Sequence, residues 1–499
     1  MLSSITRGTG LAKIAGINGM NKEPLNTLSE LENWAKNPAE ALELAGNQGT
    51  LQLDTCLRHL PSKRLTCRAI WQDKPVIAKF FYGRGFNGLL IKEALMLQAL
   101  KKSSINVPEL LHSEKQADYG VLIIQYIEQA HTLSSFFWSQ PEQLEFEARL
   151  LAVTRLMLTC QQAGFDIKDP HLDNFLYRQG DVYLIDTGDI GKKTGQLRHQ
   201  SAVQNLALLY AQLPVTLDQQ AFQVLIKGLK DLPEWQGLNE QSWQQALIRQ
   251  RRWRQKKFID KKVFRSCTAY ICERTNSRFL MAKRGVYSKE MALALTNPDE
   301  LINKGKLLKK GGTATVARVD IDGQAYVLKR YNIKKPIHSI IRGLKWSRAA
   351  VSWRNGLLLE MLGIPTAQSY AMIEERWGLL RRRSYLLSEY IDAPHAWDIY
   401  EDEQYDEESK TQWAKKIYAL FLLLKRSQIS HGDLKAQNIL CPVEGPLFID
   451  LDGLNSEQSA GAYWRQFKKD IGRFDISWPT KWKANPYFSA FSDKLLADD

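Results

Sequence analysis

The stretch His431-Gly-Asp-Leu-Lys-Ala-Gln-Asn-Ile-Leu440 decides the fold, together with Leu447-Phe-Ile-Asp-Leu-Asp-Gly453 just after it. Phosphoryl transfer needs one carboxylate beside the attacking hydroxyl, and an amide and a second carboxylate that reach metal ions on the nucleotide phosphates. Asp433 has the spacing of the base, and Asn438 and Asp450 have the spacing of the metal ligands. The pattern therefore indicates a phosphoryl-transfer catalytic loop.

Lys435 belongs to the same loop and is expected near the transferring phosphate. The alternative is a buried turn in which Asp433 and Asn438 cap helices and Asp450 ends a strand. Each residue taken alone favours that alternative. The complete set at this spacing favours the catalytic loop.

An earlier part of the chain, residues 167–188, repeats the pattern. Asp169 precedes Asn174 by five positions and Asp186 by seventeen, and both spacings equal those of the later copy. Repetition on the scale of a domain indicates duplication rather than a short structural repeat. We therefore predict Asp169 as a second base, with Asn174 and Asp186 as a second pair of metal ligands.

A strand lysine precedes each copy, Lys79 in the first and Lys329 in the second. Glu93 lies on a predicted helix and is expected to pair with Lys79, the ion pair that positions nucleotide phosphates. The alternative is a solvent-facing helix glutamate. The helix position equivalent to Glu93 is Asn355 in the second copy, and Glu360 is the acid nearby. The partner of Lys329 stays open.

A glycine turn between two strands lies one hairpin before Lys329 and predicts a phosphate loop. The equivalent residues 57–64 contain no glycine, so backbone amides there cannot easily approach phosphate, and ATP turnover is expected less in the first copy. A hinge that meets adenine should follow in the second copy. The nucleotide contacts predicted there are Gly311, Gly312, Thr313, Glu389 and Tyr390.

In both copies the strand lysine, the catalytic-loop aspartate and asparagine, and the last aspartate follow one another in the same order. This order predicts an α+β fold with two tandem protein-kinase-like bilobal domains. Each would have an antiparallel β N-lobe and a mostly helical C-lobe. The expected parts are an N-terminal extension (1–45), a first domain (46–248), a basic aromatic linker (249–275) and a second domain (276–499).

Composition sets bounds on the class of protein. An apolar fraction of 44% and a charged fraction of 24% are typical of a globular protein. No apolar run reaches the roughly 18 residues needed to span a bilayer, and the first residues lack the pattern of a secretion signal. The six scattered cysteines favour reduced thiols in a cytoplasmic protein.

The net charge of +14 favours an anionic partner, such as nucleic acid, a membrane surface or a phosphorylated glycolipid, or reflects only a solvated basic surface. Basic residues alternate with aromatic ones in residues 249–265. A helix docked by its apolar residues, with its basic face in solvent, is the favoured interpretation. A membrane-surface helix and a nucleic-acid patch are the alternatives.

At these motifs the chain resembles the bacterial lipopolysaccharide kinases, the Kdo and core-heptose kinases. The resemblance is carried by Lys329-Arg-Tyr331, Leu362-Gly-Ile-Pro-Thr366, the catalytic loop and Ile449-Asp-Leu-Asp452. It implies a bilobal kinase fold, ATP with Mg²⁺, and a sugar hydroxyl of the lipopolysaccharide core as acceptor. It also implies a cytoplasmic protein, peripheral to the inner membrane of a Gram-negative bacterium, and disfavours a nucleic-acid partner.

The two-domain arrangement departs from single-domain members of the family. Catalysis is expected mainly in the second domain, and the first would be a second enzyme, a substrate-holding pseudokinase or a regulator. The alternatives for the whole chain are a protein or small-molecule kinase of the same fold, and a pseudokinase scaffold that binds anionic glycolipid.

Overall fold

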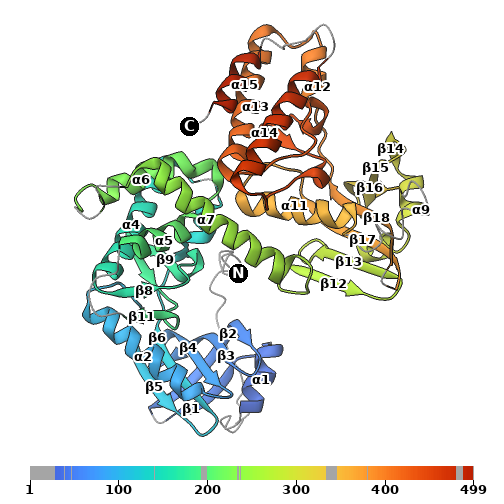
Figure 1. Cartoon of the computed structure of the whole chain (residues 1–499). Helices are drawn as coiled ribbons and strands as arrows, with labels where there is room; N and C mark the ends of the chain where they lie inside the picture. The colour runs from blue at the N-terminus through green and yellow to red at the C-terminus, as the bar shows by residue number, and fades with distance from the viewer. Residues whose placement is uncertain are drawn as a thin grey trace. The chain divides into compact units, whose positions relative to one another are not determined.

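The computed structural model describes residues 28–497, apart from positions 39, 47, 140, 193–198, 233–234, 236–237, 333–345, 379 and 479–486. Most of the predicted N-terminal extension, up to residue 27, therefore lies outside the described residues. The chain forms two compact units, one of Met1–Gln212 with Gln219–Leu247 and one of Leu213–Asp218 with Ile248–Asp499 (Figure 1). Each unit combines an antiparallel sheet with helices.

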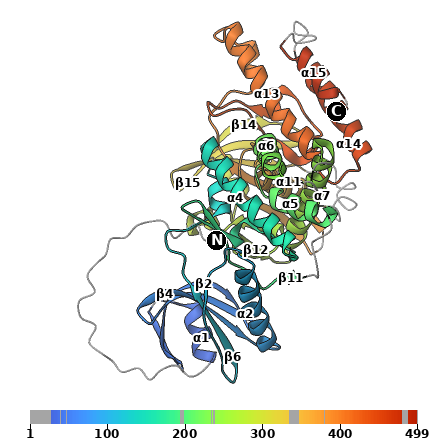
Figure 2. The ribbon, with the colours of Figure 1, turned by 90° about the vertical axis from the view of Figure 1, so that its left-hand side faces the viewer.

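The first unit begins with helix α1 (Leu28–Lys36) and a six-stranded sheet in the order β1-β2-β3-β4-β6-β5. Its strands are β1 (Leu42–Gly46), β2 (Gly49–Leu60), β3 (Arg64–Trp71), β4 (Lys74–Tyr82), β5 (Leu110–Lys115) and β6 (Tyr119–Gln125). Alternate residues of β3 are buried, as expected of a strand with one face on a core. Helix α2 (Phe86–Lys102) packs against β4, β5 and β6 (Figure 2).

Short strand pairs and helices form the rest of the first unit. The strands are β7 (His131–Thr132), β8 (Phe165–Ile167), β9 (Phe175–Arg178), β10 (Asp181–Leu184) and β11 (Ile190–Lys192). The helices are α3 (Leu133–Phe137), α4 (Gln143–Gln162), η1 (Leu172–Asn174), α5 (His199–Tyr210), α6 (Asp218–Leu229) and α7 (Glu240–Phe258), the last two crossing the unit boundary. Because α4 packs against β8 and β10, it supports the loop that carries Asp169 and Asn174.

The second unit contains a seven-stranded antiparallel sheet in the order β12-β13-β17-β18-β16-β15-β14. Its strands are β12 (Tyr270–Arg274), β13 (Arg278–Lys283), β14 (Lys306–Lys310), β15 (Ala314–Ile321), β16 (Gln324–Tyr331), β17 (Ser369–Trp377) and β18 (Leu380–Glu389). The associated helices are α8 (Lys289–Ala294), α9 (Pro298–Lys304) and α11 (Arg348–Leu362). Helix α11 lies along β17 and β18 (Figure 1).

The segment 249–275, predicted as a linker, is folded. It forms the end of α7, a π-helical turn η4 (Ile259–Val263) and strand β12 of the second sheet. Val263 is buried beside Trp353, whose indole N–H donates to the Val263 carbonyl oxygen at 3.0 Å. Lys256, Lys257, Lys261 and Lys262 are exposed. Phe258, Val263 and Phe264 are docked and these lysines are in solvent, as the favoured interpretation predicted. Trp253 and Arg251 depart from it, because Trp253 is 47% exposed and Arg251 is buried.

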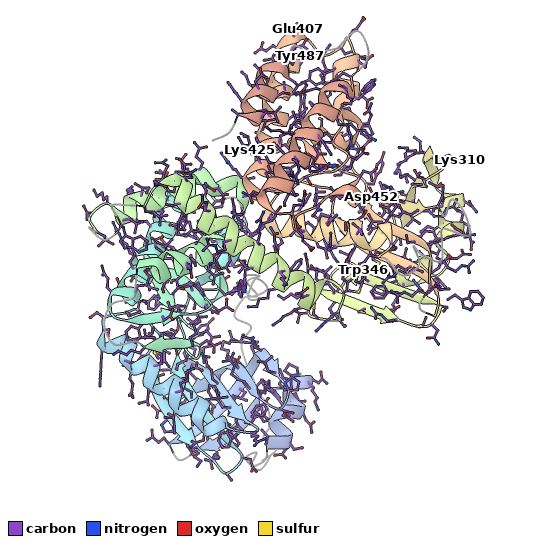
Figure 3. All side chains as sticks on the ribbon, in the orientation of Figure 1. Lys310, Trp346, Glu407, Lys425, Asp452 and Tyr487 are labelled. Carbon is purple, nitrogen blue, oxygen red and sulfur yellow. The ribbon has the colours of Figure 1, made fainter. Side chains whose placement is uncertain are left out.

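A helical core completes the second unit. Its elements are η2 (Val215–Leu217), α12 (Ala396–Glu401), α13 (Glu407–Ser427), η5 (Ala436–Asn438), β19 (Ile439–Leu440), β20 (Leu447–Phe448), η6 (Leu451–Gly453), α14 (Ala460–Ile476) and α15 (Ser489–Leu496). Phe474, Trp478 and Phe488 pack together in this core, so these tail aromatics are structural. The Tyr487 hydroxyl donates to the Glu407 carboxylate (Figure 3). Within the described part of the chain, no helix is long and apolar enough to cross a membrane.

Candidate active site

The catalytic loop of the second unit runs between α13 and β19 and is held in a shape that requires glycine at position 432. Gly432 has a φ of 80°, and a Cβ there would lie 2.2 Å from the Gly453 carbonyl oxygen. The backbone conformation and the close approach both exclude a side chain. His431 is completely buried beside Phe448. This packing fixes the backbone that presents Asp433.

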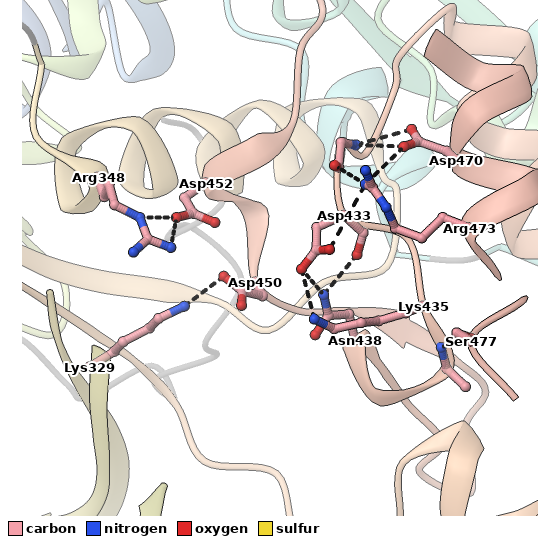
Figure 4. Close-up of polar contacts among 12 residues, drawn as sticks. Lys329, Arg348, Asp433, Lys435, Asn438, Asp450, Asp452, Asp470, Arg473 and Ser477 are labelled. Carbon is pink, nitrogen blue, oxygen red and sulfur yellow. Dashed lines mark hydrogen bonds and ion pairs between the residues drawn. The ribbon is translucent and has the colours of Figure 1, made fainter. Parts of the chain in front are cut away.

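Asp433, Lys435 and Asn438 come together as predicted (Figure 4). The Lys435 Nζ donates to Asp433 Oδ2 at 2.9 Å, and the Asn438 Nδ2 donates to the same oxygen at 3.1 Å and to the Asp433 backbone oxygen at 2.8 Å. Partial burial works to raise the pKa of Asp433, but the hydrogen bonds from Lys435 and Asn438 outweigh it and hold the pKa below its usual value. Asp433 is therefore ionised at neutral pH.

Two residues of α14 support this loop and were missed in the sequence. The buried Asp470 accepts backbone hydrogen bonds from His431 at 2.7 Å and Gly432 at 3.0 Å. Burial raises the pKa of Asp470 despite these bonds. Arg473 donates to the Gly432 carbonyl oxygen and lies 3.9 Å from Asp433 Oδ1. Asp470 and Arg473 are three residues apart and so lie on one face of α14. This spacing could not identify them as loop contacts, because the sequence does not show that this face meets the catalytic loop.

Asp450 directly follows β20 and pairs with the strand lysine. The Lys329 Nζ lies 2.6 Å from Asp450 Oδ1. Burial works to raise the pKa of Asp450, but the Lys329 charge and hydrogen bond lower it to about 2. Burial likewise works to lower the pKa of Lys329, and the nearby Tyr331, Asp450 and Asp452 raise it above its usual value. Both groups are charged at neutral pH.

The structure identifies the open partner of Lys329 as Asp450. Glu360 instead contacts Lys283 of β13, with Nζ to Oε2 at 2.7 Å. Asn355, the equivalent of Glu93, is buried and donates from Nδ2 to the carbonyl oxygens of Leu451 at 2.8 Å and Leu454 at 3.0 Å. Among the described residues, Lys329 therefore pairs with an aspartate and not with a helix glutamate, as Lys79 does with Glu93.

The predicted phosphate loop is the turn between β14 and β15. Asn332 supports it from the next strand, since its backbone N–H donates to Thr313 O and its Nδ2 to Gly311 O, both at 3.0 Å. A Cβ at Gly312 would meet nothing within 4 Å, so this side of the turn is open. The turn therefore offers an uncrowded backbone, which suits the approach of a phosphate.

The predicted hinge begins at Glu389, the last residue of β18. The Glu389 backbone N–H donates to the Gln368 carbonyl oxygen at 2.9 Å, and the Arg318 guanidinium lies 4.9 Å from the centre of the Tyr390 ring. Glu389 is paired with Tyr326 of β16 in the sheet register, and Lys329 lies three residues further along β16. The hinge and the lysine thus belong to adjacent strands.

The oxygen atoms around Asp450 fit a divalent metal ion that is shared with phosphates. Carboxylate and amide oxygens of Asp450 and Asn438 are the hard ligands that Mg²⁺ prefers, and protein Mg²⁺ sites typically use only one or two carboxylates plus phosphates. Asp452 adds a further carboxylate, held by Arg348 (Figure 4). Among the described residues, no three His, Cys, Asp or Glu side chains gather into a metal site of their own.

The predicted ion pair of the first unit is present. The Lys79 Nζ donates to Glu93 Oε1 at 2.6 Å and to the Ile185 carbonyl oxygen at 3.1 Å. Only 1% of Glu93 is exposed, which excludes the solvent-facing alternative. The Asn174 Nδ2 donates to the Asp169 backbone oxygen at 3.3 Å, which mirrors the bond from Asn438 to Asp433.

The third acid of the first unit, Asp186, has a partner that the sequence analysis did not single out. Arg64 NH2 lies 3.8 Å from Asp186 Oδ2, and Arg64 NH1 lies 3.9 Å from Glu93 Oε2. One guanidinium is thus shared by two acids of this site. The second unit shows no such arrangement among its described residues, because Lys329 holds Asp450 directly.

Comparison with known proteins relates part of the second unit first to a class, the ATP-dependent phosphotransferases, and then to a family. A family model described as the lipopolysaccharide kinase (Kdo/WaaP) family matches residues 302–478. The matched region contains the glycine turn, Lys329, the catalytic loop, Asp450 and α14. This match confirms the family resemblance predicted from the motifs, and the family implies ATP and a divalent metal ion as cofactors.

A solved structure of WaaP in complex with acyl carrier protein is also similar, at 15% identity and a TM-score of 0.32. The similarity covers 40% of this chain and 88% of that chain. No curated protein matches the chain.

Proposed function

We propose that the second unit transfers the terminal phosphoryl group of ATP, with Mg²⁺ as the metal ion, to a sugar hydroxyl of the lipopolysaccharide inner core. Asp433 would act as base, Lys435 as the cation at the transferring phosphate, and Asn438 with Asp450 as metal ligands. The first unit is a second kinase-like domain with a degenerate or auxiliary role. The chain would thus be a tandem of two kinase-like domains, predicted over residues 46–248 and 276–499, with α1 packed on the first and β12 in the sheet of the second.

One observation carries this proposal: two carboxylates of the matched region are each held ionised by a lysine. Asp433 lies 2.9 Å from Lys435, and Asp450 lies 2.6 Å from Lys329. Both carboxyl groups have a pKa below the usual value. One base and one metal ligand, charged at neutral pH, are what phosphoryl transfer requires.

Bound ATP with its metal ion supplies the transferable phosphoryl group and neutralises the charge on the phosphates. Asp433 orients the acceptor hydroxyl and accepts its proton. Because the pKa of Asp433 is low, it takes the proton late, once bonding to phosphorus has made the hydroxyl acidic. Asn438 holds Asp433 through one hydrogen bond to its carboxylate and one to its backbone carbonyl oxygen, and Lys435 balances the charge there.

The nucleotide would lie between the glycine turn and the hinge. The turn would bring the backbone at Gly312, the position with open space around it, to the phosphates, and the backbone of Glu389 and Tyr390 would meet adenine. The family match and the net charge of +14 support an anionic glycolipid as the acceptor. Such an acceptor places the protein at the cytoplasmic face of the inner membrane, bound peripherally.

The test is a transfer assay with labelled ATP, Mg²⁺ and core glycolipid from cells that lack this chain. We expect Asp433→Asn to reduce label in the glycolipid by at least about a hundredfold, and Asp169→Asn to reduce it far less. The control Asp493→Asn removes an exposed carboxylate of α15 and should match wild type.

Other outcomes identify the alternatives. Tight binding of ATP without label in glycolipid, but with label in protein or a small molecule, would favour another acceptor class. Failure to bind ATP at all would favour a pseudokinase scaffold. Equal losses from Asp433→Asn and Asp169→Asn would contradict the proposed division between the two units.

A further inference from the structure

Arg64 of the first unit occupies a strand position that corresponds to an uncharged residue in the second unit. In the register of β3 with β4, Thr66 is opposite Lys79 and Arg64 is two residues earlier. In the register of β15 with β16, Val316 is opposite Lys329, and the residue two positions earlier is Ala314. The sheets therefore make Arg64 the counterpart of Ala314.

The turns before Arg64 and Ala314 also differ in how easily a phosphate can approach their backbone. Ala314 follows the open turn of Gly311, Gly312 and Thr313, whereas Arg64 follows Pro61, Ser62 and Lys63. Proline has no backbone N–H to donate, and side chains on this turn hinder the approach of a phosphate to its backbone. The first unit has thus replaced backbone donors by a guanidinium, which binds phosphate oxygens in a bidentate manner.

The guanidinium also lies where it competes with a metal ion. Asp186 would be the first unit's principal metal-binding carboxylate, yet Arg64 NH2 is 3.8 Å from its Oδ2. A divalent cation on this carboxylate would face a like charge within a few ångströms, and such charges repel in a partly buried site. A cation also lies beside the equivalent acid of the second unit, since Lys329 Nζ is 2.6 Å from Asp450, but Asp452 adds a further carboxylate there. The first unit has Gly188 at the position of Asp452, so it offers a metal ion one carboxylate fewer than the second unit does.

A second cation completes the anion-binding geometry. Lys79 is 93% buried and is fixed by Glu93 at 2.6 Å, and the same glutamate lies 3.9 Å from Arg64. Glu93 thus anchors both cations near one another. Arg64 keeps 21% of its side chain exposed, so it remains accessible to a ligand.

We propose that the first unit is a phosphate-binding site that works without a divalent metal ion, with Arg64 in place of the metal and Lys79 as the second cation. The ligand is a phosphate monoester or anhydride, either a nucleotide or a phosphorylated sugar. This inference does not depend on the acceptor or the activity of the second unit.

The experiment is calorimetric titration of the full chain with ATP and, separately, with glucose 1-phosphate, in excess EDTA and in excess Mg²⁺. We expect one of these ligands to bind in EDTA. Arg64→Ala should weaken that binding by at least about tenfold, the loss of one charge-assisted contact. Arg64→Lys keeps the charge and should retain most of the affinity.

Two matched variants assign the binding to this site. In a Lys329→Ala background, which weakens nucleotide binding by the second unit, the binding in EDTA that depends on Arg64 should persist. Arg68→Ala lies on the same strand as Arg64 but pairs with Asp54 at 2.9 Å, and it should also bind normally. Because Arg64→Ala frees Asp186, the double variant Arg64→Ala/Lys329→Ala should bind ATP more tightly in Mg²⁺ than in EDTA.

The ligand that binds in EDTA decides between a nucleotide site and a sugar-phosphate site, and either result supports the proposal. Absence of binding in EDTA, or wild-type binding that Lys329→Ala abolishes and Arg64→Ala leaves intact, would overturn it. Circular dichroism on each variant separates loss of binding from loss of fold.

Discussion

Replacing Asp470 by alanine should loosen the catalytic loop without touching any residue of the proposed chemistry. Only 1% of Asp470 is exposed, and its carboxylate accepts hydrogen bonds from the backbone N–H groups of His431 and Gly432. The variant would leave these two donors without their acceptor in the protein interior. Asp433 follows immediately in the chain, so its position depends on the same backbone.

The expected destabilisation follows from the two bonds. A hydrogen bond to a charged group contributes about 1.5–3 kcal/mol, so two sum to about 3–6 kcal/mol. Burial of the carboxylate, which raises the pKa of Asp470, offsets part of this sum. We therefore expect Asp470→Ala to lower the free energy of unfolding of the second unit by about 3 kcal/mol. Asp470→Asn keeps an acceptor oxygen and should cost about half as much.

Hydrogen exchange of the His431 and Gly432 amides measures the effect directly, and urea unfolding measures the total. Asp475→Ala on the same helix is the matched control, because Asp475 accepts a single hydroxyl bond, from Ser492 at 2.9 Å. The control should cost about 1 kcal/mol and leave loop exchange unchanged. Unchanged exchange at His431 and Gly432 in Asp470→Ala, with an unfolding shift no larger than the control's, would refute the reasoning.

Three further perturbations have defined outcomes. Gly432→Ala should abolish transfer and destabilise the second unit by about 2–4 kcal/mol in thermal unfolding, because the position has a φ of 80° and its Cβ would lie 2.2 Å from a backbone oxygen. Gly472→Ala, in open space on α14, should instead be neutral or slightly stabilising. The pKa of Asp450 falls from 3.8 to about 2, so its ionised form stabilises the fold above pH 4. The stability advantage of wild type over Asp450→Asn, about 1–2 kcal/mol, should shrink in chemical unfolding as the pH falls toward 2, and an advantage independent of pH would contradict this. Arg251→Ala should cost about 3–5 kcal/mol in urea unfolding, since it leaves the carboxylate of Asp218 buried without the guanidinium that lies 2.5 Å away; a loss below about 1 kcal/mol would contradict it.

The residues that the sequence could place are those with a fixed spacing along the chain. Asp433 and Asn438 are five positions apart, and the short helix η5 returns the amide to the carboxylate at 3.1 Å. Lys79 and Glu93 were predicted as a pair because a strand followed by a helix brings them together, and their atoms lie 2.6 Å apart. Both contacts join residues close in the sequence, so the order and spacing of the residues are enough to predict them.

The residues that the sequence could not place act across long separations. Asp470 reaches the loop from 39 positions away, and Arg64 reaches Asp186 across more than a hundred. Neither separation along the sequence can be predicted from the repeat of a helix or a strand. The partner of Lys329 stayed open for a related reason. The aligned helix position holds Asn355, which is not an acid, and only the fold shows that Glu360, the acid nearby, is engaged by Lys283. Tertiary packing determines the partners of Asp470, Arg64 and Lys329.

The two hydrogen bonds of Asn355 have a consequence for motion. In a site of the kind formed by Lys79 and Glu93, a helix that swings outward breaks the ion pair and disables the lysine. In the second unit, Asn355 of α11 donates hydrogen bonds to the carbonyl oxygens of Leu451 and Leu454, which lie one and four residues after Asp450. Motion of the helix is therefore coupled to the backbone that follows Asp450. A regulator that pushed on α11 would shift the metal-ligand carboxylate itself, rather than disengage the lysine from a helix.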